Sequence, residues 1–522
     1  MAKQPREQWA TRTGFLLAAI GSAIGLGNIW RFPAVAYENG GGAFLFPYLI
    51  ALLTAGIPLL IMEYAIGRRY RTSPPAALRQ MARPAEAIGW WQVVISFVIA
   101  TYYAVIIAWA VRYIGFSADQ AWGDDPEGFL FGTFLKASEE PGFVSGYVSG
   151  VLWPLIAVWV VVLGILAFGI RRGIETANKI FIPLLVVFFV ALVIRALTLD
   201  GAAQGLDAFF RPDWSELTNG SVWVAAYGQI FFSLSIGFGI MITYASYLRR
   251  RADLTGSALV AGFANSSFEI LAGIGVFATL GFMAQAAGVP VGEVATAGLG
   301  LAFVAFPTII SEMWLGGAFG VLFFVSLVIA GLSSLISIVQ VVVSAVQDRT
   351  GMRRIPAVFG VGGAVAVASI LLFPTNEGVY LLDASDHFIN QYGIAMAALV
   401  GVIAVAWFMR KLPELQRDAD ATSAMRLGLW WRICLGIVTP VVLGWMMIDS
   451  LRSEFDENYE DYPTGFLLGA GWSVAIAALV VGVLLSLIPW KASEGGLSDL
   501  DMESLEEAEG NRKGKRHGKG DR

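Results

Sequence analysis

The feature that most constrains this chain is a series of apolar segments that each run for about 20 residues without a charge. Residues 151–170 are one example, since they contain no Asp, Glu, Lys or Arg. A helix of about that length crosses the roughly 30 Å hydrocarbon core of a bilayer. Of the 522 residues, 57% are hydrophobic and 14% are charged, whereas a soluble domain has about 25% charged residues. The sequence therefore predicts an all-α membrane protein.

Twelve membrane-spanning helices are predicted from these segments. Their approximate bounds are 14–37, 42–67, 88–115, 149–169, 174–198, 221–248, 254–284, 314–347, 355–373, 379–409, 427–450 and 464–489. Residues 1–13 form a cytoplasmic segment before them, and 490–522 form a polar tail that is expected to be disordered. The single cysteine, Cys434, lies in an apolar run and is expected to be a buried, inert thiol.

The loops between the predicted spans differ in the sign of their charge. Basic residues follow the even-numbered spans, and they include Arg68, Arg69, Arg71, Arg171, Arg172, Arg249, Arg250, Arg251, Arg353, Arg354 and Arg410. The opposite loops are acidic, and they include Asp124, Asp125, Glu127, Glu139, Glu140, Glu454, Asp456 and Glu457. The positive-inside rule then predicts that both termini lie in the cytoplasm. Short termini and loops without cysteine favour a multi-pass protein of a prokaryotic inner membrane.

Glycine and polar residues interrupt the first and sixth predicted spans at membrane depth. The interruptions are residues 21–28 (GSAIGLGN) and residues 233–239 (SLSIGFG), and each glycine lowers helix stability by about 1 kcal/mol relative to alanine. The first span starts inside and the sixth starts outside, so the breaks hold corresponding places in two inverted five-helix repeats. Paired breaks of this kind indicate a binding site near the bilayer midplane of a transporter. Freed carbonyls can hold a cation, and the N–H groups near Leu26 and Gly27 suit a carboxylate.

This interpretation divides the chain into segments. Residues 14–198 form the first repeat, residues 221–409 form the inverted second repeat, and residues 427–489 form helices 11 and 12.

Several stretches of the sequence resemble the neurotransmitter:sodium symporter family. They are residues 9–14 (WATRTG), 25–33 (GLGNIWRFP), 38–44 (ENGGGAF), 228–239 (GQIFFSLSIGFG) and 242–247 (ITYASY). The resemblance runs from about Arg6 to the tenth span, whereas spans eleven and twelve match only in type. It implies sodium-coupled symport by alternating access, with two sodium ions as the coupling ions.

The same resemblance implies which residues hold each sodium ion. One site would use the carbonyls of Gly21, Ile24 and Ala330 with the hydroxyls of Ser333 and Ser334. The other would use the Ala23 carbonyl, the side chains of Asn28, Asn265 and Ser233, and the carboxylate of the substrate. An all-oxygen shell is what a hard cation prefers.

Glu269 stands four residues after Asn265, on the same helical face. Chloride-dependent members of the family have a serine at the matching position and bind an anion nearby. The resemblance therefore implies that Glu269, beside Tyr48 and Gln229, replaces chloride, so that transport needs none. An ionisable residue inside a membrane is a functional candidate in its own right.

Gly25 occupies the position where monoamine carriers of the family have an aspartate. A glycine leaves room for a substrate that brings its own carboxylate, which indicates an amino acid, and Tyr103 would donate a hydrogen bond to that carboxylate. The substrate site implied by the resemblance comprises Ala23, Gly25, Leu26, Gly27, Ile99, Tyr103, Ile106, Phe232, Ser233, Ser235, Phe238, Ser337 and Ile338. Because its side-chain pocket has no fixed charge, neutral, apolar or aromatic L-amino acids are expected.

Two ion pairs are expected to act as gates, again by resemblance. Arg31 and Asp386 would close the outer vestibule, with Phe238 as an aromatic lid. Arg6 and Asp348 would close the cytoplasmic side, supported by Trp9 and Tyr247. In the fifth span, Gly173 and Pro183 match a motif at which the helix can unwind to let sodium reach water.

Two other functions remain open at this point. A proton-coupled amino-acid transporter of the same fold would use Glu269 as its proton site, and a transport-dead amino-acid sensor would keep the pocket but lose a gate. No nucleophile with a base and no metal motif appears in the apolar spans, so an enzyme is not expected. The expected partners are an amino acid, sodium ions and the lipid bilayer, with no nucleic acid; a homodimer is possible.

Overall fold

The computed structural model describes residues 6–143, 146–294 and 298–490, and within them the chain is helical and forms no β-strand, only two isolated β-bridges. The all-α fold is thereby confirmed. Residues 1–5 of the predicted N-terminal segment and residues 491–522 of the predicted tail lie outside the described residues. The Cys434 thiol is free and buried, as expected.

The helices of the two predicted repeats have the following bounds. The first repeat contains α1 (Arg12–Ala23), α2 (Leu26–Glu38), α3 (Leu45–Ala51), α4 (Ile57–Tyr70), α5 (Pro74–Met81), α6 (Glu86–Asp119), α7 (Pro126–Gly128), α8 (Ser149–Ala167) and α9 (Glu175–Leu197), and α10 (Ala202–Phe210) follows it. The second contains α11 (Gly220–Ser233), α12 (Ile240–Ala245), α13 (Leu254–Ala287), α14 (Val291–Val294), α15 (Gly298–Gly300), α16 (Phe306–Glu312), α17 (Gly316–Thr350), α18 (Arg354–Ala357), α19 (Gly363–Leu372), α20 (Gly378–Phe388) and α21 (Ala395–Ile403). The remaining helices are α22 (Leu412–Thr422), α23 (Leu429–Ile433), α24 (Thr439–Asp456), α25 (Thr464–Phe466) and α26 (Ser473–Leu487).

Ten helical segments within the described residues are long and apolar enough to cross a membrane. The pair α1 and α2, which is bent by 54°, makes an eleventh candidate. The predicted sixth span corresponds to α11 and α12, which lie on either side of the non-helical residues 234–239 and are each too short to count as a full span. The total of twelve therefore stays a prediction.

Local sequence explains where the main helices begin and end. The Thr11 side chain accepts a hydrogen bond from the Gly14 N–H at the start of α1, and the Asp253 side chain does the same for Gly256 at the start of α13. These caps satisfy N–H groups that have no partner inside the helix. α17 ends at Gly351, whose φ of +71° suits a residue without a side chain.

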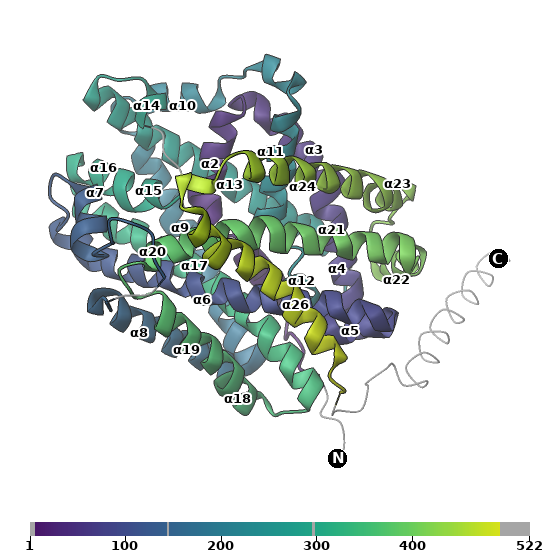
Figure 1. Cartoon of the computed structure of the whole chain (residues 1–522). Helices are drawn as coiled ribbons and strands as arrows, with labels where there is room; N and C mark the ends of the chain where they lie inside the picture. Colours follow the sequence, from purple (N-terminus) through teal and green to yellow (C-terminus); the bar gives the residue numbers. More distant parts are fainter. Residues whose placement is uncertain (1–5, 144–145, 295–297, 491–522) are drawn as a thin grey trace.

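The long helices α6 and α17 pack side by side and form the centre of the molecule (Figure 1). α8 and α19 run along α6 on one side, and α26 crosses it on another. α1 packs against α9, α13 and α17. The break between α1 and α2 therefore lies inside the helix bundle. Its free backbone groups are shielded there from lipid, in which an unpaired N–H or C=O group is costly.

Candidate functional site

The break in the first span places polar backbone groups beside α6. α1 ends at Ala23 and α2 begins at Leu26. The Asn28 side chain caps α2, because its Oδ1 accepts a hydrogen bond from the Gly25 N–H at 2.9 Å. The Leu26 N–H donates to the Tyr103 hydroxyl at 3.3 Å. The structure thus brings the predicted carboxylate-binding residues together at the positive end of a half-helix.

The second break lies against the first. In residues 234–239, Ser235, Gly237 and Gly239 have φ values of +53°, +94° and +85°, a backbone conformation that costs glycine little. The Ser235 hydroxyl donates to the Ser22 carbonyl at 2.8 Å. This hydrogen bond joins the second break to the last turn of α1, next to the first break.

Two residues that sequence reasoning missed hold the second break. The Glu63 carboxyl accepts a hydrogen bond from the Gly237 N–H at 2.8 Å, and the Ser96 hydroxyl donates to the Phe238 carbonyl at 2.9 Å. Both side chains are buried, so they satisfy backbone groups that the lost helix leaves free. Glu63 could have been found, because a lone charge inside a predicted span is a functional candidate by itself.

The side chains predicted for one sodium site form a continuous chain of hydrogen bonds. Asn28 Nδ2 donates to Asn265 Oδ1 at 2.8 Å, and Asn265 Nδ2 donates to Ser233 Oγ at 3.0 Å. All three side chains are buried. Ala23, the last residue of α1, adds a carbonyl from the end of that helix. These uncharged oxygen atoms match the ligands that a hard cation prefers.

The residues predicted for the other sodium site also meet. Ser333 Oγ lies 2.7 Å from the Gly21 carbonyl oxygen and 2.8 Å from that of Ala330. Ser334 Oγ lies 3.4 Å from the Gly21 oxygen. The predicted ligand Ile24 follows directly after α1. The α1 end and the middle of α17 therefore present carbonyl and hydroxyl oxygens to one another, which is again an all-oxygen donor set.

Glu269 is fully buried on α13, one helical turn after Asn265. Gln229 Nε2 donates to its Oε1 at 2.6 Å, and the Tyr48 hydroxyl donates to its Oε2. Each carboxylate oxygen thus has a donor. This pattern suits an ionised carboxylate, which can only accept hydrogen bonds.

The predicted substrate residues surround the two breaks. Ile99, Tyr103 and Ile106 come from α6, Ser337 and Ile338 from α17, Phe232 and Ser233 from the end of α11, and Ser235 and Phe238 from the second break. Most are buried, whereas Gly25, Gly27, Tyr103 and Phe232 keep partial exposure. A Cβ atom on Gly25 would lie 3.1 Å from the Tyr103 hydroxyl and 3.3 Å from Ser334 Oγ. The space beside Gly25 is therefore bounded by one substrate residue and one sodium-site residue.

The predicted cytoplasmic gate is formed in this structure. Arg6 Nη1 lies 2.7 Å and 2.9 Å from the two Asp348 carboxylate oxygens, and its guanidinium lies 4.9 Å from the centre of the Tyr247 ring. Trp9 Nε1 donates to the Tyr244 carbonyl at 2.9 Å. The N-terminal segment is thereby fastened across α12 and α17.

The predicted outer gate pair is not joined. The Arg31 guanidinium lies 3.7 Å from the centre of the Phe232 ring, and the Asp386 carboxylate accepts a hydrogen bond from Asn390 at 2.8 Å. Among the described residues, no ion pair links Arg31 to Asp386. The ion pair on one side of the site is formed, and the pair on the other side is not. Alternating access requires such an arrangement in one of its states.

The fifth span begins with a tight contact. Residues Ile170–Ile174 form a π-helical turn at the start of α9, and a Cβ atom on Gly173 would lie 2.0 Å from the Ile165 carbonyl oxygen. Glu175, which sequence reasoning also missed, accepts hydrogen bonds from the Ala10 N–H at 2.7 Å and the Thr11 hydroxyl at 2.9 Å. The N-terminal segment is thus tied to α9 near the predicted unwinding motif.

The helical fold, with two interrupted helices whose breaks are held inside the bundle, is that of an all-α integral membrane protein. The family model described as the Sodium:neurotransmitter symporter family matches residues 6–128 and 139–493, and the chain belongs to this family. Members of the family are transporters and not enzymes, and they depend on sodium.

Three relatives illustrate the range of similar proteins. An uncharacterized sodium-dependent transporter of Methanocaldococcus jannaschii is 41% identical over 486 residues, which cover 93% of this chain and 98% of the relative. A sodium-dependent dopamine transporter of Bos taurus is 31% identical, covering 92% of this chain and 74% of the relative. A sodium- and chloride-dependent GABA transporter of Drosophila melanogaster is 32% identical, covering 91% of this chain and 55% of the relative.

Proposed function

We propose that this transporter carries a neutral, apolar or aromatic L-amino acid together with two sodium ions, by alternating access and without chloride. The observation that carries the proposal is the surroundings of Gly25. The Tyr103 hydroxyl accepts a hydrogen bond from the Leu26 N–H at the positive end of α2, and its own O–H would donate to a substrate carboxylate placed there. Gly25 itself supplies no charge, so the negative charge that suits this end of the helix has to come from the substrate.

The two oxygen-rich clusters support the sodium stoichiometry. The cluster of Asn28, Asn265 and Ser233 adjoins the carboxylate-binding end of α2. A substrate carboxylate there would complete the ion's oxygen shell and partly neutralise it. The cluster at Ser333 and Ser334 needs no such help, since backbone carbonyls face both hydroxyls.

The environment of Glu269 supports independence from chloride. Its carboxylate lies one helical turn from Asn265, where residues on one helix face are about 5–6 Å apart. A fixed negative charge at that distance can offset the charge of the sodium ion. The Drosophila relative is described as chloride-dependent, so the ion requirement is one property in which this chain is proposed to differ.

The charge pattern of the loops supports a multi-pass protein of the cytoplasmic membrane with both termini inside. In that orientation the joined Arg6 and Asp348 pair closes the cytoplasmic side, and the separate Arg31 and Asp386 leave the outer side unlatched. The structure then corresponds to a state that accepts substrate from outside.

Uptake into proteoliposomes tests the proposal. Purified protein is reconstituted, and a panel of radiolabelled amino acids and dopamine is offered with an inward gradient of sodium, or with choline or potassium in its place. We expect uptake of apolar or aromatic L-amino acids with sodium only, equal in chloride and in gluconate, and no uptake or displacement by dopamine.

The other outcomes point to the alternatives. Uptake that follows an imposed proton gradient and ignores sodium would indicate the proton-coupled transporter with Glu269 as its proton site. Sodium-dependent binding without any uptake would indicate an amino-acid sensor. Displacement of the bound ligand by dopamine alone would show that the role given to Gly25 is wrong.

A further inference from the structure

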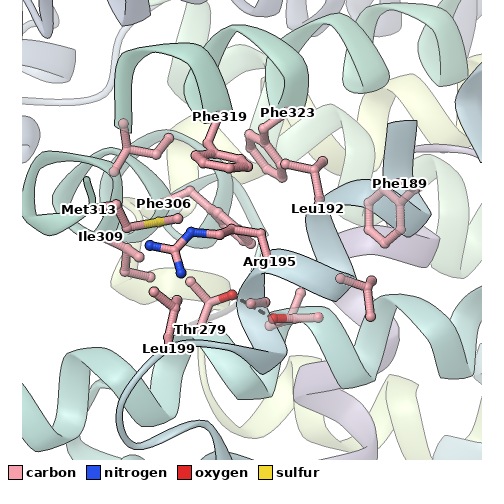
Figure 2. Close-up of a pocket in the computed structure, with 15 residues that line it drawn as sticks. Phe189, Leu192, Arg195, Leu199, Thr279, Phe306, Ile309, Met313, Phe319 and Phe323 are labelled. Atoms are coloured by element: carbon pink, nitrogen blue, oxygen red, sulfur yellow. Dashed lines mark hydrogen bonds between the residues drawn. The ribbon is translucent and has the colours of Figure 1, made fainter. Parts of the chain in front are cut away.

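A hollow with apolar walls lies at the C-terminal end of α9, between α13, α16 and α17 (Figure 2). It has a volume of about 40 Å³. Fifteen residues line it, and all except Arg195 and Thr279 are apolar or glycine. Four phenylalanine rings contribute, and the rings of Phe306 and Phe323 are stacked with their centres 4.1 Å apart. No residue assigned to the transport site lines this hollow.

The hollow reaches the surface of the helix bundle beside α9. This helix belongs to a candidate membrane-spanning segment, and the lining residues Leu192, Phe306 and Phe319 are only partly buried. Apolar side chains exposed on a spanning helix lie against the acyl chains of the bilayer. An occupant that enters from the membrane therefore meets apolar walls throughout.

Arg195 is the one charged residue of the lining. Figure 2 shows its guanidinium extending over the hollow toward Ile309 and Met313. Its Nη1 donates to the Thr198 hydroxyl at 2.8 Å, and its guanidinium carbon lies 5.6 Å from the centre of the Phe319 ring. Arg195 forms no ion pair with any described residue. A guanidinium has five N–H donors, so most of this group's bonding capacity is available to a ligand.

Thr279, the second polar residue of the lining, has no hydrogen available to donate to a ligand. The Thr279 hydroxyl donates to the carbonyl of Gly275, four residues earlier on α13, at 2.5 Å. Its hydrogen is therefore used within its own helix. The hollow combines an apolar interior with a single cation and no anion.

We propose that this hollow binds an anionic phospholipid, with part of an acyl chain packed against its apolar wall and the headgroup phosphate on Arg195. An aliphatic chain matches the apolar walls, and the phosphate provides an anionic partner for the Arg195 guanidinium. An arginine side chain suits a phosphate, because its planar fork of N–H donors matches the phosphate oxygens. A zwitterionic lipid would fill the hollow less well, because its own cation competes with Arg195 for the phosphate.

Photo-crosslinking of the full chain in lipid nanodiscs tests this proposal. The probe is phosphatidylglycerol with a photoreactive diazirine in one acyl chain, and labelled peptides are identified by mass spectrometry. We expect labelling within residues 189–199 and 306–323, competed by unlabelled phosphatidylglycerol and only weakly by phosphatidylcholine. Replacing Arg195 with glutamine is expected to reduce this labelling about fivefold.

Two further variants separate charge from shape. Arg112→Gln is the matched control, because Arg112 also lies over a ring, at 4.7 Å from Phe116, but lines no part of the hollow; its labelling should equal that of the wild type. Ala196→Phe fills the hollow and leaves Arg195 in place, so labelling should again be lost.

The control measurement for each variant is a monodisperse profile in size-exclusion chromatography. Equal labelling by a phosphatidylcholine probe, unchanged labelling in Arg195→Gln, or labels outside the two segments would overturn the proposal. Crosslinks to a second copy of the chain at these residues would overturn it as well, because the surface would then be a contact between copies.

Discussion

Glu269 allows the sharpest test at the level of single residues, because its predicted role depends on charge alone. Two unit charges about 5 Å apart at an effective dielectric near 20 attract by roughly 3 kcal/mol. Losing that attraction weakens sodium binding by about two orders of magnitude. Glu269→Ser should therefore transport weakly in gluconate and recover in part when chloride is added, as measured by radiolabelled amino-acid uptake.

The wild-type protein is the reference for this variant, and its uptake should be the same in both anions. Wild-type uptake that stops when chloride is removed contradicts the role assigned to Glu269. A serine variant that is equally weak with and without chloride would indicate a structural role for the carboxyl, in contact with Tyr48 and Gln229.

Gly25→Ala tests the shape of the substrate site. The added Cβ would lie 3.1 Å from the Tyr103 hydroxyl and 3.3 Å from Ser334 Oγ. Both contacts are tighter than ordinary packing, and overpacking costs about 1–3 kcal/mol. We expect substrate binding in detergent to weaken by about 5-fold to 150-fold. Gly115→Ala is the control, because Gly115 lies within α6 and a Cβ atom there would have nothing within 4 Å; this variant should bind as the wild type does. Equal affinities for all three proteins would contradict the prediction.

At the level of elements, the N-terminal segment is expected to act as a latch across α12 and α17. Arg6 holds Asp348 through both carboxylate oxygens and also lies within 2.8 Å of Ser246 Oγ. Arg6→Ala should release the cytoplasmic side, so that uptake falls several-fold while substrate binding in detergent is kept. Transport and equilibrium binding, measured on the same preparation, check this.

A second ion pair provides the control for the latch. Arg12 and Asp253 are 3.3 Å apart, and the Arg12 side chain is 53% exposed. Exposed pairs of this kind contribute about 0–1 kcal/mol, so Arg12→Ala should leave both readouts nearly unchanged. The latch interpretation fails if the two alanine variants behave alike.

Gly173 lies in the π-helical turn before α9 and packs against the end of α8. Because a Cβ atom there would lie 2.0 Å from the Ile165 backbone oxygen, Gly173→Ala must move backbone, which costs about 1–3 kcal/mol or more. Its thermal midpoint, followed by fluorescence-detected size exclusion, should fall below that of the wild type. Gly164→Ala on α8, whose Cβ would have nothing within 4 Å, should melt as the wild type does. A midpoint for Gly173→Ala that matches this control would mean that the turn relaxes at little cost.

For the molecule as a whole, the two oxygen-rich clusters predict electrogenic transport. Two sodium ions and a zwitterionic substrate carry net positive charge inward, and each elementary charge gains about 2.3 kcal/mol per 100 mV. An inside-negative potential, set by a potassium gradient and valinomycin, should accelerate uptake into proteoliposomes. Uptake that is indifferent to the potential would mean that a counter-ion leaves in each cycle, which the proposed stoichiometry does not include.

The sequence predicted those parts of the site that depend on local chain properties. Glycine and polar residues inside two apolar spans indicated both breaks, and the structure has them at Ile24–Gly25 and at residues 234–239. The breaks follow from residue type and order along the chain. The meeting of Asn28, Asn265 and Ser233 was implied by the family resemblance and by no local pattern.

Contacts between distant elements were not predictable in the same way. The hydrogen bond from Gly237 to Glu63 depends on how α4 packs against α12, and the position of Arg31 over Phe232 depends on how α2 packs against α11. The total of twelve spans also could not be settled by helix length, since breaking the sixth span leaves two pieces that are each short. These features depend on helix packing and on conformational state, and a local sequence pattern specifies neither.

The chain of amides from Asn28 to Ser233 has a consequence for the speed of ion entry. The amide nitrogens of Asn28 and Asn265 each donate one hydrogen bond within this chain. The oxygens Asn28 Oδ1 and Asn265 Oδ1 each accept one hydrogen bond and keep one lone pair. At the proposed sodium site, those lone pairs are available to an ion without either side chain being turned over. Arrival of the ion should then be limited by the loss of its water shell and not by rearrangement of the protein, and its association rate should depend little on how rigid the surrounding helices are.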